Sequence, residues 1–347
     1  MKFYKLLLII LIVFSQTGNV LSNSNIFDVN NIEIEKKGKI SNEVLANKAI
    51  TKSFKQLIEK ILLKKDVEKL KELKFTEIKE LVSYYQVSNK INNNNVEKIN
   101  YNISFDKDKI HDLFYKKNIS YSEITNKELF ILPILRKKDQ VYIYNQNFFY
   151  DKWNEFNDNN LIEFILPLEN IEIIQYVNSY KNDLLNLDLR ELFQEYSGKN
   201  LALVLIEDNS SKEEKIYFKT KIQGKNIFRN VNIKRFDLSE NEFYKKIITE
   251  VKIEIISLVK SQNLIDVRIP SFLNVKLKIN KKNNLAILNS RLQRIDLIDN
   301  IYVQKFNNKS IYLKIKYLGK LDKIIRQLES QKILLKLINN EWNIEII

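Results

Sequence analysis

The chain has 347 residues, of which 44% are hydrophobic and 29% are charged, which is enough apolar content for packed cores and excludes disorder as its general state. It has no cysteine and one histidine, which excludes disulfides, thiolate catalysis and zinc sites built on these ligands. It has five glycines and neither of the common glycine-rich phosphate-binding motifs, so such a nucleotide site is not expected.

The net charge of +14 is carried mostly by lysine. A cationic surface attracts nucleic acid and anionic membranes without selectivity, whereas specific recognition of phosphates and bases favours arginine, which is scarce here. An AT-rich genome favours the Ile, Asn and Lys that abound in the chain, which explains the charge without any ligand. We therefore do not expect nucleic acid as a partner. A lysine-rich binder of anionic lipid or nucleic acid is retained as a third alternative.

The N-terminal segment has the pattern of a secretory signal peptide. Lys2 and Lys5 precede a short apolar run, and Val20 and Ser22 occupy the −3 and −1 positions of a cleavage site before Asn23. We expect residues 1–22 to be removed and the protein to be exported to the periplasm or cell envelope; the alternative is an uncleaved anchor. No later stretch approaches the ~18 apolar residues of a membrane-spanning helix.

The first domain is expected over residues 23–120, with a strand near Ile32. Ser41 can cap a helix whose apolar residues recur at helical spacing: Ala46, Ala49, Ile50, Phe54, Leu57, Ile58, Ile61 and Leu62. Two short helical segments and a strand pair around the polar turn 92–95 follow. The second strand of this pair alternates, and four of its residues should share the buried face: Ile99, Tyr101, Ile103 and Phe105. Asp106 should cap the next helix.

The second domain is expected over residues 121–263. Three apolar runs are typical of strands buried in a sheet: 128–135, 161–168 and 201–207. Ser239 and Glu242 form a capping box for a long helix, whose buried stripe is predicted to contain Phe243, Ile247, Val251, Ile255 and Leu258. Strands that alternate with helices favour a mixed α/β sheet.

The third domain is expected over residues 264–347. Its alternating and helical patterns, closed by KILLKLI and WNIEII, give the order β-α-β-β-α-β, which is that of a ferredoxin-like domain. The whole chain is thus assigned to the α+β class, as three small mixed α/β modules with the last one ferredoxin-like.

An aromatic cluster stands out within residues 129–153. Aromatic side chains at this density can line a binding groove, and the candidate groove contains Pro133, Tyr142, Tyr144, Phe149 and Trp153. The alternative is that these side chains are core, because of the large area each one buries.

Groups for catalysis are few. His111 lies off the apolar stripe of its helix, so a surface position is expected rather than a catalytic one. Asp106, Asp108 and Asp112 lack the glycine of a calcium loop and are interpreted as a helix cap with its first-turn acids. We predict no catalytic residue, no metal and no cofactor.

Carboxylate pairs leave one enzymatic alternative open. Glu155, Asp158 and Glu163 lie near a strand end of the second domain, and two such acids could hydrolyse a glycoside. With 43 acidic residues in the chain, neighbouring acids are also expected by chance.

The β-α-β-β-α-β order is also that of an RNA-recognition motif, which stacks bases on aromatic side chains of its open sheet face. In the third domain this face offers Lys276, Lys278, Tyr312, Lys314 and Lys316, so it has one aromatic and no stacking platform. An anionic membrane, a cell-wall polymer, an acidic partner or water are the alternatives for this face, so peripheral membrane contact is left open.

Several segments follow one another in a recognisable succession: ANKAITKSFKQLIEKIL, YYQVSNKI, YNISFD, LPILRKKDQVYIYNQNFFYDKW, FILPLENIEII and YLGKLDKIIRQLESQKILLKLINNEWNIEI. This succession resembles an uncharacterised bacterial envelope family, domain of unknown function 2066, over most of the chain after residue 22. The chain departs from the family's pattern in being poor in Ala, Gly and Arg. The resemblance implies an exported envelope protein and carries over no catalytic residue.

The leading hypothesis is a non-enzymatic envelope interaction protein whose partner is an envelope protein or a cell-wall polymer. The alternative is a carboxylate-dependent hydrolase acting on a cell-wall or glycan substrate, which requires paired acids in a cleft.

Overall fold

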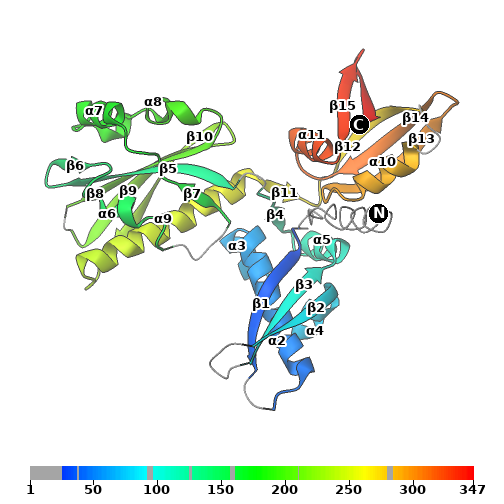
Figure 1. The fold of residues 1–347 in the computed structure, drawn as a ribbon, viewed down its shortest axis with the longest axis horizontal. Helices are drawn as coiled ribbons and strands as arrows, with labels where there is room; N and C mark the ends of the chain where they lie inside the picture. Colours follow the sequence, from blue (N-terminus) through cyan, green and yellow to red (C-terminus); the bar gives the residue numbers. More distant parts are fainter. Residues whose placement is uncertain are drawn as a thin grey trace, which may run out of the picture. The chain divides into compact units, whose positions relative to one another are not determined.

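The computed structural model describes residues 26–36, 39–91, 97–124, 127–156, 161–209, 211–279 and 284–347 (Figure 1). The α+β class is confirmed: helices accompany several small sheets. The segment predicted to be a signal peptide, 1–22, lies outside the described residues.

The chain divides into two compact units. Unit 1 contains the described residues up to Leu57 together with Glu72–Ile119 and Asp266–Ile347, and unit 2 contains Ile58–Lys71 and Ser120–Ile265. The main segment of unit 2 has nearly the bounds expected for the second domain, 121–263. Most residues of the other two expected domains belong to unit 1.

The first sheet of unit 1 is antiparallel, in the order β1-β3-β2. Its strands are β1 (Asp28–Lys36), β2 (Val82–Ile91) and β3 (Glu97–Phe105), and its helices are α2 (Asn42–Ile61), α4 (Phe75–Glu80) and α5 (Lys107–Lys116). The alternation predicted for β3 is confirmed, since all four apolar side chains from Ile99 to Phe105 are at most 4% exposed. The predicted stripe from Ala46 to Leu62 is also buried.

The predicted cap of α5 is present. The Asp106 carboxylate accepts hydrogen bonds from the backbone N–H groups of Asp108 (3.0 Å) and Lys109 (3.1 Å). These donors have no partner within the helix, so the cap stabilises its first turn.

The second sheet of unit 1 has five strands in the order β13-β14-β12-β16-β15. Its elements are β12 (Ser271–Lys278), α10 (Asn284–Leu292), β13 (Ile298–Phe306), β14 (Ser310–Tyr317), α11 (Leu321–Ser330), β15 (Ile333–Ile338) and β16 (Glu341–Ile346). The arrangement β13-β14-β12 is the one a ferredoxin-like order requires, with the middle strand antiparallel to both neighbours.

On the other side of β12 the sheet has two strands, β16 and β15, where the predicted β-α-β-β-α-β order has one. The chain turns back at Asn339 and Asn340, both at positive φ (50° and 60°), which is the backbone of a tight hairpin. As a result β16 enters between β12 and β15 and runs parallel to β12.

Unit 2 contains a mixed sheet in the order β10-β9-β8-β5-β6, with β7 also paired to β5 (Figure 1). Its strands are β5 (Glu128–Lys137), β6 (Gln140–Tyr142), β7 (Glu163–Ile165), β8 (Asn200–Asp208), β9 (Glu213–Ile222) and β10 (Lys225–Lys234). The helical segments are α3 (Lys64–Glu68), α6 (Phe148–Lys152), α7 (Ile171–Ser179), η1 (Leu184–Asn186), α8 (Leu189–Leu192), η2 (Gln194–Tyr196) and α9 (Glu240–Gln262). Two short strands, β4 (Ser120–Ser122) and β11 (Leu264–Asp266), form a separate pair.

The central strand β5 is covered on both faces, as its apolar run predicts. Leu129 and Ile131 point into a core shared with α6 and α9, whereas Phe130 and Leu132 point into the opposite core, shared with α7 and α8. The capping box at Ser239 is present. The predicted stripe of α9 is buried from Phe243 to Ile255, and Leu258 packs half-buried against the same core.

Pro133 sits in the middle of this central strand because one side of β5 is open there. Strand β8 pairs along all of residues 129–137 on one side, whereas on the other side β7 pairs with 128–130 and β6 with 135–137. A proline cannot donate a backbone hydrogen bond, so it is tolerated where the N–H would face no neighbouring strand.

The buried side chain of Asn147 fills this gap. Its Nδ2 donates to the carbonyl oxygens of Pro133 (2.9 Å), Tyr142 (3.1 Å) and Ile143 (2.8 Å), and its Oδ1 accepts from the N–H of Phe149 (3.1 Å). One amide therefore satisfies main-chain groups of β5, β6 and the following turn, and also caps α6.

Two lysines of α9 are buried for a similar reason. Lys252 Nζ donates to the carbonyl oxygen of Trp153 (2.5 Å), just after α6, and Lys260 Nζ donates to those of Glu59 (2.5 Å) and Leu62 (3.0 Å) at the end of α2. Both satisfy carbonyls that helix ends leave free. Burial lowers the pKa of Lys260 to about 8, against an opposing effect of Glu59.

We expect Asn147→Ala to lower the free energy of unfolding of unit 2 by about 3 kcal/mol, because it leaves several buried carbonyl oxygens without a hydrogen-bond donor and removes a helix cap. Urea unfolding followed through Trp153, in a Trp342→Phe background, measures this. Asn145→Ala, two residues away and exposed, is the matched control and should change the free energy by less than about 0.5 kcal/mol. Equal effects of the two variants would contradict the role given to Asn147.

We expect the stabilising contribution of Lys260 to increase between pH 8 and pH 10. In this range the unfolded chain keeps the Lys260 proton whereas the folded chain loses it, so the free energy of unfolding rises with pH. The difference between the native chain and Lys260→Met should grow by about 2 kcal/mol over this range. A difference that stays constant or shrinks would show that the lysine remains charged in the folded state.

Candidate functional site

The five residues predicted to form a groove do not form one. Phe149 and Trp153 are completely buried in the core beneath α9, and Tyr144 is 2% exposed in the core on the opposite face of the sheet. Pro133 is buried within β5, and Tyr142 is half-buried. The groove prediction is therefore wrong, because the sheet separates these side chains and each face already has a layer of helices over it.

An open pocket lies instead among the helical segments between β7 and β8. It has a volume of about 270 Å³, and we call it the acidic pocket. Its lining comes from the loop before α7, from α7, α8 and η2, and comprises Pro167, Leu168, Asn170, Glu172, Ile173, Tyr176, Glu191, Leu192, Gln194, Glu195 and Tyr196.

Packing and hydrogen bonds hold the aromatic wall of the acidic pocket. The Tyr196 ring stacks on Phe130 of β5 at 4.2 Å between centroids. The Tyr176 hydroxyl accepts a hydrogen bond from the N–H of Asp188 (3.1 Å), and the Tyr150 hydroxyl donates to the carbonyl of Pro167 (2.8 Å). The wall is thus fixed to the central sheet and to the loop that follows β7.

Tyr144 from the predicted groove lies beside the residues that support this wall. Its ring meets Tyr150 edge to face at 5.1 Å, and burial raises its pKa to about 12. The aromatic segment within residues 129–153 therefore supports the acidic pocket from behind and does not line it.

The rim of the acidic pocket combines negative charge with exposed apolar groups. Leu168 lines the pocket and is 82% exposed. Ile171, which begins α7 between the lining residues Asn170 and Glu172, is 73% exposed. The lining contains three glutamates, Glu172, Glu191 and Glu195, and no lysine or arginine among the described residues. This combination suits a ligand that offers a cation next to an apolar group.

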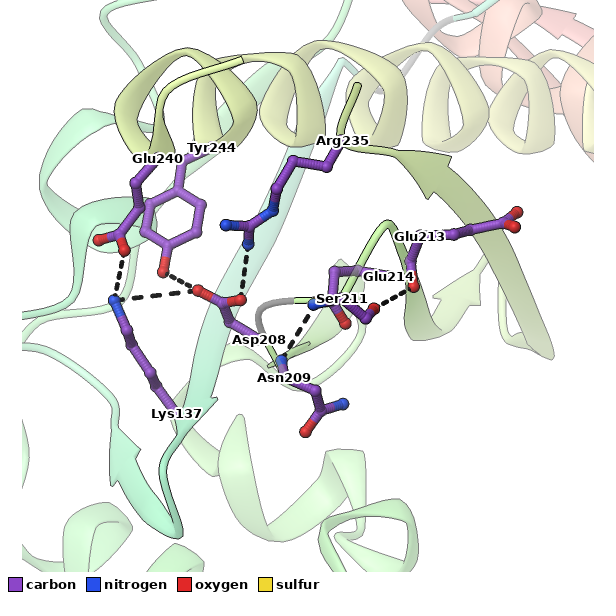
Figure 2. Close-up of polar contacts among 9 residues, drawn as sticks. All are labelled: Lys137, Asp208, Asn209, Ser211, Glu213, Glu214, Arg235, Glu240 and Tyr244. Carbon is purple, nitrogen blue, oxygen red and sulfur yellow. Dashed lines mark hydrogen bonds and ion pairs between the residues drawn. The ribbon is translucent and has the colours of Figure 1, made fainter. Parts of the chain in front are cut away.

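The carboxyl ends of the parallel strands β5 and β8 form a second candidate site, since ligands of open α/β sheets bind at such edges. Figure 2 shows Asp208, the last residue of β8, surrounded by three side chains. Its oxygens accept from Arg235 Nη2 (2.7 Å) and the Tyr244 hydroxyl (2.6 Å), and Lys137 Nζ lies 3.9 Å away. Lys137 also pairs with Glu240 (2.6 Å).

A second buried carboxylate closes the neighbouring loop in Figure 2. Glu214 is 2% exposed and accepts hydrogen bonds from the N–H groups of Asn209 (3.2 Å) and Ser211 (2.8 Å). Burial and the bond to Asp208 raise the pKa of Tyr244, so its hydroxyl stays a donor. Both carboxylates are engaged by the protein's own groups, so we interpret this edge as a structural lock that ties β8 to β5 and α9.

The histidine and the acids considered as catalytic groups do not belong to the acidic pocket. His111 is half-buried, its ring 5.6 Å from Phe27, and burial, then the charge of Lys107, lowers its pKa to about 4. It is thus less exposed than expected. Glu155 is exposed and pairs with Lys152 (2.5 Å), Glu163 is exposed on β7, and Asp158 lies outside the described residues. No set of three or more potential metal ligands is found in the part of the chain that the structure describes.

The lysines on the open face of the third domain are partly engaged. Lys276 lies over Tyr312 (5.3 Å) and pairs with Glu341 (3.3 Å), and Lys316 pairs with Asp299 (2.6 Å). These contacts lower the positive charge this face offers to an anionic partner.

Within the described ranges, no helix has the length and apolar content to cross a membrane. No family model and no curated protein matches the chain. One solved structure, titled "Crystal structure of uncharacterized protein", is 10% identical over 40% of this chain and 94% of its own, with a TM-score of 0.17, too low to support an argument.

We expect Asp208→Asn to lower the free energy of unfolding of unit 2 by about 3 kcal/mol, because it leaves the Arg235 charge largely buried without its partner. Urea unfolding measured through Trp153 tests this. The neighbouring Glu207→Gln removes a longer, more exposed pair with Arg136 (3.6 Å) and should cost less than about 0.5 kcal/mol. If Asp208→Asn leaves stability unchanged, the lock interpretation fails.

Proposed function

We propose that this chain is an exported, non-enzymatic interaction protein of the bacterial envelope, and that it binds a partner protein through the acidic pocket. The observation that carries the proposal is the pocket itself: in a chain of net charge +14, it gathers three glutamates and the highly exposed Leu168, and the exposed Ile171 lies between two of its lining residues. Export is supported by the signal-like pattern of residues 1–22 and by the resemblance to the domain of unknown function 2066, which we propose as the family of this chain.

The partner we propose presents a lysine or arginine beside an apolar side chain on an exposed segment. Its apolar group would cover Leu168 and Ile171, which would otherwise stay in water. Its cation would lie among Glu172, Glu191 and Glu195 and against the ring of Tyr196. The pocket's small volume suits one or two side chains, not a whole domain face.

The same lining favours a second candidate, a hydrolase acting on a cell-wall or glycan substrate. Carboxylates and aromatic rings in one pocket are the groups that glycoside hydrolysis uses for proton transfer and sugar binding. This candidate takes Glu172, Glu191 and Glu195 as its acids, in place of the residues near 155–163.

A photocrosslinking amino acid at Leu168, in the protein expressed in its native host, tests the interaction proposal. We expect it to capture a defined envelope protein, and we expect Glu191→Lys in the same chain to reduce the yield at least about tenfold by placing a like charge in the pocket. The same amino acid at Tyr115, an exposed position of unit 1, is the control. Capture that is equal from both positions, or unaffected by Glu191→Lys, would contradict the proposal.

The hydrolase candidate is tested on the purified chain with cell-wall fragments, by measuring released soluble sugars. Activity lost in Glu172→Gln, Glu191→Gln or Glu195→Gln would favour it over the interaction proposal. Activity that is absent, or that survives all three substitutions, would remove it.

A further inference from the structure

The outermost strand of the five-stranded sheet, β13, is long and largely uncovered. It forms one edge of the order β13-β14-β12-β16-β15, and Figure 1 shows it beside α10. Tyr302, Val303 and Phe306 are 44%, 52% and 77% exposed. An edge strand presents unpaired backbone N–H and C=O groups, and one with exposed apolar side chains is a template for pairing with another strand.

An apolar groove runs along this strand. It has a volume of about 500 Å³ and is lined by Leu285, Ala286, Leu288, Asn289, Leu292, Ile301, Val303 and Leu313. Helix α10 buries Leu288 and Leu292, but leaves Leu285 36% exposed. The helix therefore covers the inner strands of the sheet and leaves the apolar side of β13 accessible.

The residue order of β13 is chemically symmetric about Tyr302. In an antiparallel pair with a second β13 centred on this residue, Asp299 would face Lys305 of the other copy, and Asn300 would face Gln304. Ile301 would face Val303. Ile298 is 6% exposed and its carbonyl oxygen accepts a hydrogen bond from Lys107 Nζ (2.9 Å), so the pairing does not extend to it. In the pairs from 299 to 305, an apolar residue thus meets an apolar one, an amide an amide, and a charge its opposite, twice over.

We propose that β13 is a homodimer interface, in which two copies of this chain pair their β13 strands antiparallel about a two-fold axis at Tyr302. The partner is a second copy because the strand complements itself in charge and in polarity. The two α10 helices lie on the same side of the joined sheet, so Leu285 and Ala286 of each copy come to border the groove of the other. Pairing covers the backbone edge and the apolar groove together.

Strand β10, at one edge of the mixed sheet of unit 2, has charges that disfavour pairing with a second copy. Strand β10 of unit 2 begins with Lys225, ends with Lys234 and carries Arg229 near its centre. If two copies of β10 paired side by side and antiparallel about the centre of the strand, Lys225 would lie opposite Lys234 of the other copy. Such like-charged edges prevent pairing, whereas β13 lacks this protection.

Two irregularities define how much of β13 can pair. The register against β14 shifts between Ile298 and Asn300 and again between Val303 and Lys305. Bulges bend a strand and increase its twist, so regular ladder bonds in a pair centred on Tyr302 are confined to residues 301–303. Asp299 already pairs with Lys316 of its own copy (2.6 Å), so the Asp299–Lys305 pairs add charge complementarity across the axis, and the α10 contacts must supply much of the stability of the dimer.

Cysteine crosslinking tests the register directly, because the native chain has no cysteine. Residues opposite each other in an antiparallel pair have Cα atoms about 4.5–5.5 Å apart, which a disulfide can bridge. We expect oxidised Tyr302→Cys to form a covalent dimer, and Phe228→Cys, on exposed β10, to stay monomeric under the same conditions. No more dimer from Tyr302→Cys than from Phe228→Cys would overturn the proposal.

Sedimentation velocity over a concentration series supplies the second measurement. The native chain should dimerise, and Lys305→Glu should raise the dimer dissociation constant at least about tenfold, because it places two like-charge pairs across the axis. Lys309→Glu makes the same charge change outside β13 and should leave the constant unchanged, with circular dichroism confirming that both variants fold. A native chain that stays monomeric throughout the series would overturn the proposal, as would equal effects of the two variants.

Discussion

The parallel pairing of β5 with β8 is the constraint on which unit 2 depends. The two strands pair in one register from Leu129 opposite Asn200 to Lys137 opposite Asp208. Because both are apolar along almost their whole length, the pair is stable only when both faces are covered, which requires one layer with α6 and α9 and another with α7 and α8. The aromatic residues that follow β5 are used in these two layers, so they are not free to form a surface groove.

The same pairing brings Lys137 and Asp208 to one edge of the sheet, where many α/β proteins bind a ligand. Here Arg235 and Tyr244 occupy the oxygens of Asp208, and the edge serves as a lock. The open pocket lies elsewhere, in the helical layer between β7 and β8. Negative charge and exposed apolar groups coincide in this layer, at the acidic pocket.

The net positive charge of this chain is spread unevenly over its surface and is partly neutralised by ion pairs. On the open face of the five-stranded sheet, lysines are engaged by Glu341, Asp299 and the ring of Tyr312, so the large net charge does not translate into an equally large free cationic surface. The edge strands differ as well: β10 carries cations at both ends, whereas β13 carries one acid and one base in symmetric positions. The sign pattern of an edge, more than the total charge, decides whether it can pair.

Features that depend on neighbours along the chain can be predicted from the sequence alone. These are the α+β class, the buried stripe of α2, the alternation in β3, the Asp106 cap and the Ser239 capping box, because helical spacing, period-two alternation and capping act within a few residues. The sequence also indicated that β5 is buried on both faces. The predicted β-α-β-β-α-β order has too few strands at the C-terminus, since it counts KILLKLI and WNIEII as one closing strand, whereas they are β15 and β16 of a hairpin.

The contacts between residues far apart in the sequence are visible only in the folded chain. The burial of Phe149 and Trp153, the clamp that Asn147 makes on Pro133, and the gathering of Glu172, Glu191 and Glu195 all follow from how the helical layers pack on the sheet. The sequence pattern shows that a residue is aromatic, polar or acidic. Whether that side chain is buried or exposed depends on long-range packing, and its function here depends on which of the two it is.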